Sequence, residues 1–65
     1  MKFYYNGKLI RTSKTHVYNL AIIDPTDGGV YACRRDRSDA ESEYNRLLRA
    51  GCAPEKVKIV PLEAK

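Results

Sequence analysis

The chain has 65 residues, of which 43% are hydrophobic and 31% charged, and its formal net charge at pH 7 is +4. This length indicates a single domain spanning residues 1–65, and the composition excludes a disordered chain. The longest apolar run, residues 20–23, is far too short to span a membrane, and the first residues hold no long apolar stretch typical of a secretory signal. A cytoplasmic protein with no membrane role is therefore expected.

The chain opens with two β-type segments separated by Asn6-Gly7, the pattern that most strongly predicts a two-residue hairpin. The expected cross-strand pairs are Tyr5 with Lys8, Tyr4 with Leu9, and Phe3 with Ile10. Residues 16–24 predict a long strand that is apolar on both faces over its second half, as in a central strand. A turn over residues 24–29 and a strand over residues 30–35 follow. If this turn pairs Asp24 with Val30, Ile22 lies opposite Ala32 and Leu20 opposite Arg34.

A helix is predicted at about residues 39–50. Ser38 and Glu41 have the spacing of a capping box, apolar residues then recur at helical intervals, and Gly51 stands where a helix commonly ends. Residues 56–60 alternate like a last strand. The resulting order is β-β-β-β-α-β, which indicates an α+β domain: a mainly antiparallel sheet with one helix packed on one face.

One helix covers only one face of such a sheet, so the other face is expected to be open. Alternation of side chains assigns Tyr18, Leu20 and Ile22 to the helix-covered core, and Val17, Ala21 and Ile23 to the open face. The open face would also carry basic and aromatic side chains, with further arginines at its edge before the helix. These candidate binding residues are Tyr4, Arg11, Tyr31, Arg34, Arg35 and Arg37.

The charge is asymmetric along the chain. Residues 1–37 carry seven basic groups, three acidic groups and four of the five tyrosines, whereas residues 38–65 carry five charges of each sign. A basic sheet with exposed rings can bind nucleic acid, because cations contact phosphates and tyrosines stack on bases. The alternative is a protein-interaction or homodimeric module that uses the same tyrosines and arginines. A third possibility is that these residues form an ordinary solvated surface.

The succession of an Asp24-Pro25-x-x-Gly28-Gly29 turn, a basic strand end and a Ser-x-x-Glu helix start resembles the AP2-like N-terminal domains of phage-type integrases. The likeness covers about residues 16–50, while the first hairpin and the last strand depart from that pattern. It implies a three-stranded sheet backed by one helix that binds DNA through the sheet, and a phage or mobile-element origin.

Catalysis has little support in the sequence. His16 is the only histidine, no Gly-rich phosphate loop is present, and neither Cys33 nor Cys52 belongs to a Cys-x-x-Cys motif. Both cysteines are expected to be free thiols packed as small apolar groups. The sequence therefore predicts a binding module rather than an enzyme, with no metal, no cofactor and no small-molecule substrate.

Overall fold

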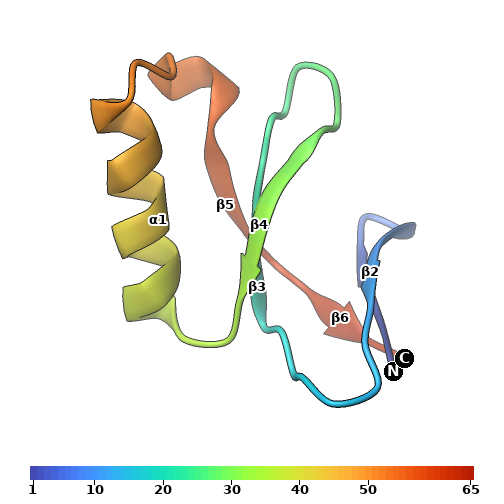
Figure 1. Cartoon of the computed structure of the whole chain (residues 1–65). Coiled ribbons are helices and arrows are strands. Elements are labelled where there is room, and N and C mark those ends of the chain that lie inside the picture. Colours follow the sequence, from blue (N-terminus) through green and yellow to red (C-terminus); the bar gives the residue numbers. More distant parts are fainter.

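Two small antiparallel sheets and one helix form the fold in the computed structural model, which describes residues 1–65 (Figure 1). The first sheet has the order β2-β1-β6, with bounds Lys8–Thr12, Lys2–Tyr5 and Glu63–Ala64. The second has the order β4-β3-β5, with bounds Val30–Arg34, Leu20–Ile23 and Lys58–Pro61. Helix α1 (Arg37–Arg49) packs on this second, central sheet, and the 3₁₀ turn η1 (Pro54–Lys56) leads into β5. The predicted α+β class and element order are confirmed, and β6 is an additional strand.

The prediction that one face of the central sheet is open is wrong, because the first sheet covers that face. Ala21 and Ile23 of β3 are 0% and 6% exposed and form a cluster with Cys33 and Val60. Side chains from the first sheet and its connections pack against this cluster: Tyr5, Ile10, Tyr18 and Leu62. The central sheet is thus the middle of three layers, with α1 on one side and the β1–β2 hairpin on the other (Figure 1).

The hairpin forms around the predicted turn. Asn6 and Gly7 both have positive φ, at 50° and 75°, as a type I′ turn requires, and the predicted pairs of Tyr5 and Tyr4 are confirmed. Phe3, however, lies opposite Arg11 rather than Ile10, because a β-bulge adds one residue to β2. The bulge lets two consecutive side chains point inward: Ile10 packs on the core cluster, and the Arg11 guanidinium lies on Tyr18.

Strand β3 is shorter than predicted. It begins at Leu20, and residues 13–19 form an irregular connection from the hairpin. The predicted pairs Ile22–Ala32 and Leu20–Arg34 between β3 and β4 are confirmed. The predicted pair of Asp24 with Val30 at the turn is wrong, because Val30 lies opposite Ile23. A second bulge, at Tyr31, takes up the extra residue.

Helix α1 begins two residues before its predicted start. Its N-cap is Asp36 and no side chain caps it, so the expected capping box of Ser38 and Glu41 is wrong. The C-terminal end is as expected: Gly51 has φ 104°, and the Cys52 N–H donates to the Leu47 carbonyl at 3.1 Å. This helix is neither long nor apolar enough to cross a membrane.

Candidate nucleic-acid interface

The six candidate binding residues do not share one surface. Tyr4 alternates with the fully buried Phe3 on β1, so its ring lies on the outer face of the first sheet, where the Lys65 ammonium stands 5.5 Å from the ring centroid. Tyr31 lies at the opposite end of β4 from the helix start, and its hydroxyl donates to the Lys56 carbonyl at 3.1 Å. Partial burial raises the pKa of Tyr31 above its ordinary value. Neither tyrosine meets a candidate arginine.

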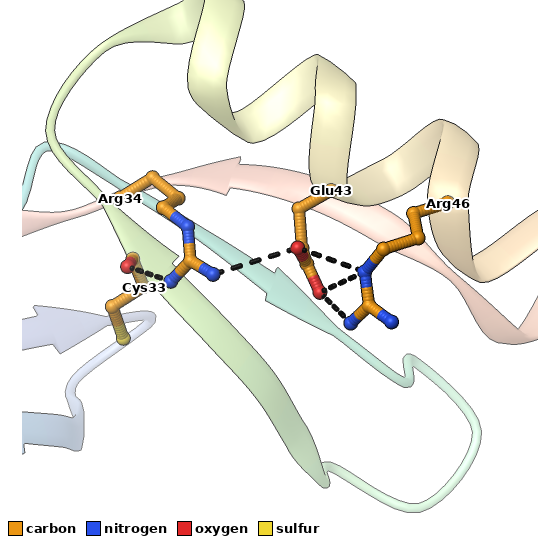
Figure 2. A network of polar contacts seen from close by, with 4 residues as sticks. All are labelled: Cys33, Arg34, Glu43 and Arg46. Carbon is orange, nitrogen blue, oxygen red and sulfur yellow. Dashed lines mark hydrogen bonds and ion pairs between the residues drawn. The ribbon is translucent and has the colours of Figure 1, made fainter.

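Arg34 belongs to a polar network on the helix side of the central sheet (Figure 2). Its guanidinium lies 3.5 Å from Glu43 on α1 and donates to the Cys33 carbonyl at 2.7 Å. Glu43, whose side chain is only 15% exposed, also accepts hydrogen bonds from Arg46. The bonds from Arg46, followed by the charges of both arginines, lower the pKa of Glu43 below its ordinary value. Arg34 therefore already has an anionic partner and serves to attach α1 to β4.

Arg11 occupies a different setting on the hairpin side. Its guanidinium carbon lies 4.8 Å from the centroid of the Tyr18 ring, within the range of a cation–π contact. The same ring meets Phe3 edge-on, at 5.5 Å and 80°, and the imidazole of His16 nearly parallel, at 6.1 Å and 18°. Arg11 also stands close to the Cys33 thiol, whose pKa is raised by burial while the Arg11 charge opposes that rise. We name Phe3, Arg11, His16 and Tyr18 the Tyr18 cluster.

The connection that carries His16 and Tyr18 is held by short polar contacts. The hydroxyl of Ser13 accepts from the N–H groups of Thr15 and His16, at 3.3 and 2.9 Å. Asn19 then ties the connection to the end of β4: its N–H donates to the Arg34 carbonyl at 3.1 Å, and its side chain donates to the Arg35 carbonyl at 3.0 Å. Residues 13–19 and the corner between β4 and α1 consequently meet at one end of the molecule, the lower end in Figure 1.

This end carries exposed cations that have no anionic partner. The two ion pairs in the protein both involve Glu43, with Arg34 and Arg46, so four exposed cations here stand without a carboxylate within 4 Å: Arg11, Lys14, Arg35 and Arg37. The acidic groups nearest along the chain are Asp36 and Asp39, also exposed. We call these four cations, together with His16 and Tyr18, the basic end.

The basic end brings together three of the six candidate residues, namely Arg11, Arg35 and Arg37, and leaves out the other three. It also includes three residues that the sequence did not assign to binding: Lys14, assigned to a polar connection, Tyr18, assigned to the helix-covered core, and His16. The signal for them was present, because residues 14–18 place a lysine, a histidine and a tyrosine within five positions.

A concave feature lies between the two sheets at the hairpin turn, away from the basic end. It is a pocket of about 370 Å³ lined by Tyr5, Asn6, Lys8, Ile10, Ile23, Pro25, Gly28 and Lys58. The Lys8 ammonium already donates to the Gly28 carbonyl at 3.2 Å, which leaves Lys58 as its one uncommitted cation. No group of three or more histidine, cysteine, aspartate or glutamate side chains is arranged to hold a metal ion.

Fold and site together define a small α+β domain with three layers and a basic, aromatic end. No family model matches the chain, and comparisons with curated proteins and with solved structures find no match. The likeness to AP2-like integrase domains therefore stays a prediction from the sequence.

Proposed function

We propose that the protein is a cytoplasmic binding module, not an enzyme, and that it contacts nucleic acid through the basic end. The supporting observation is the group of four exposed cations without carboxylate partners at the end where residues 13–19 meet the corner between β4 and α1. One of them, Arg11, lies on the Tyr18 ring. This proposal keeps the expected class of partner but moves the contact away from the sheet face, which the hairpin covers.

Phosphates suit this surface for a physical reason. Binding to a phosphate chain releases the counterions condensed on that chain. A cation without a carboxylate partner gains more from this contact than a cation that must first give up an ion pair. Arg37 adds the start of α1, where the first backbone N–H groups have no side-chain acceptor. Such groups favour anions, and the arginines beside them would position a phosphate there.

Protein association has less support from the geometry. The apolar residues that would have formed a homodimer patch on the open face include Ala21 and Ile23, which are buried beneath the hairpin. The large apolar side chains that remain exposed lie on four separate segments of the fold: Met1, Leu9, Val17, and Val30 with Tyr31. We therefore advance nucleic-acid binding as the one candidate function.

Titration with short labelled oligonucleotides, single-stranded and duplex, tests the proposal. At about 50 mM salt we expect binding that weakens as salt rises, with a log–log slope of about −0.7 to −0.9 for each phosphate contacted. Arg11→Ala and Arg35→Ala should each weaken binding and make this slope shallower by about one contact. Arg49→Ala is the matched control, because Arg49 is an exposed arginine at the far end of α1.

Two results would contradict the proposal. One is the absence of binding to any oligonucleotide at about 50 mM salt, where phosphate contacts are strong. The other is an equal loss of affinity for Arg49→Ala and Arg35→Ala, which would show a contribution from total charge without any role for the basic end.

A further inference from the structure

We infer that the ligand of the basic end is a single strand, with one unpaired base stacked on the imidazole of His16. This inference rests on the proposed function and specifies its ligand. It is based on two neighbouring rings at this surface: the ring of His16 is exposed, whereas the ring of Tyr18 is covered.

The His16 ring is exposed but is held in a fixed orientation. The Thr15 hydroxyl and the His16 Nδ1 atom are 2.9 Å apart, which leaves Nε2 free of any protein partner. The backbone of His16 is fixed by its hydrogen bond to Ser13, and the ring lies nearly parallel to that of Tyr18. A solvent-exposed ring that is already oriented loses little conformational entropy on binding, so a stacking partner gains more from it.

Tyr18 itself is not available for stacking. Its ring is half-buried and contacts Phe3, His16 and the Arg11 guanidinium. The ring that the cluster offers to a ligand is therefore that of His16, and a base placed on it would extend the existing stack by one member. Arg11 and Lys14, both exposed and without a carboxylate partner, precede His16 in the sequence by five and two residues and can contact the phosphates of the same strand.

A duplex fits this surface less well. Bases within a duplex are covered on both faces by their neighbours, so a flat protein ring can stack only on an unpaired or terminal base. Reading a duplex groove would instead require a projecting helix or strand pair. α1 packs on the central sheet, and that sheet is itself covered on both faces, so neither projects as an element that could enter a groove.

The test compares a single-stranded deoxythymidine oligomer with a duplex of equal length by fluorescence anisotropy. His16→Ala should weaken binding of the single strand by about 5- to 150-fold, the effect of one lost stacking contact, and leave duplex affinity unchanged. His16→Phe should retain most of the affinity because it keeps a flat ring, whereas His16→Lys should not, although it places a cationic side chain at the same position. Lys14→Ala should weaken both ligands through its phosphate contact alone.

A spectroscopic readout locates the base directly. On addition of the single strand, the ring protons of His16 should shift upfield in NMR spectra, because they enter the ring current of the stacked base. Equal losses of single-strand and duplex affinity in His16→Ala, or unchanged single-strand affinity, would overturn the inference and leave the proposed function standing. Absence of binding to both ligands would overturn both.

Discussion

The two sides of the central sheet use arginine differently. On the helix side, Arg34 lies between the Cys33 carbonyl and Glu43, and Glu43 also holds Arg46 (Figure 2). On the hairpin side, Arg11 meets the Tyr18 ring and no carboxylate, and the same end of the molecule carries three further unpaired cations. A single carboxylate, that of Glu43, therefore distinguishes the two arginines. Arg34 is held by it and attaches α1 to β4, whereas Arg11 stays available to a ligand.

This difference follows from where the acidic residues lie. The helix side faces α1, and one of its carboxylates, Glu43, is placed against the end of β4. The hairpin side faces β1, β2 and β6, whose one acidic residue, Glu63, pairs with Tyr4 on the outer face of that sheet. Four of the seven basic residues of the first part of the chain therefore lie at the basic end without a carboxylate partner.

The largest effect is expected from Phe3→Ala, which tests whether the hairpin is a full layer of the core. Phe3 is completely buried and packs edge-on against Tyr18. Truncating a buried Phe typically costs about 3–5 kcal/mol, most of the stability of a domain this small. Urea denaturation should therefore show a largely unfolded protein, whereas Phe3→Leu should lose less than about 1.5 kcal/mol. A cooperative transition near the wild-type midpoint for Phe3→Ala would make the hairpin an appendage and end the three-layer description.

Arg11→Ala should destabilise the free protein by only about 0.5–1 kcal/mol, the usual strength of an exposed cation–π contact. Thermal unfolding without ligand measures this change, and Arg35→Ala, whose side chain has no ion pair, should stay within about 0.5 kcal/mol of the wild type. A loss above about 2 kcal/mol for Arg11→Ala would make Arg11 as structural as Arg34 and remove the contrast between the two sides.

Glu43→Gln tests the helix side through its pH dependence. The pKa of Glu43 is lowered in the folded protein, so its ion pairs stabilise the fold above its ordinary pKa, and this contribution is lost as pH falls through the lowered value. We expect the variant to unfold at a slightly lower temperature than the wild type at pH 7. The gap should close in acid, where the wild-type carboxyl is also protonated, and Glu41→Gln should show no such gap because Glu41 has no ion pair. A difference that persists unchanged to pH 2 would contradict the ion-pair account.

The local structure was largely predictable because its signals are local. Asn6 and Gly7 can occupy positive φ, and Gly51 ends the helix, so the elements follow from short stretches of sequence. The register near each turn also followed from turn chemistry, up to the two bulges at Ile10 and Tyr31, which no turn residue announces.

The layering could not be derived from these signals. A hairpin that extends the central sheet and a hairpin that folds over it share the same alternation of apolar residues, so the placement depends on contacts far apart in sequence. The apolar stretch at residues 20–23 was the one clue, since all four side chains are buried and a strand apolar on both faces needs cover on both. The position of the candidate site depends on this placement. Because the hairpin covers the sheet face, the proposed binding surface lies at the basic end instead.

The smallest effect is expected from Ser38→Ala, which separates two positions for the start of α1. Ser38 would be the N-cap if the helix began at residue 39, and its loss would then cost about 1 kcal/mol. The structure instead places Ser38 inside the first turn, after the N-cap Asp36, so alanine should leave stability unchanged or raise it by up to about 0.5 kcal/mol through its better helix propensity. Asp36→Ala should lower stability by about 0.3–1 kcal/mol, because a negative charge at this end favours the helix dipole. Chemical denaturation of the two variants resolves the order. A larger loss for Ser38→Ala than for Asp36→Ala would move the helix start to residue 39 and lengthen the corner that carries Arg35 and Arg37 at the basic end.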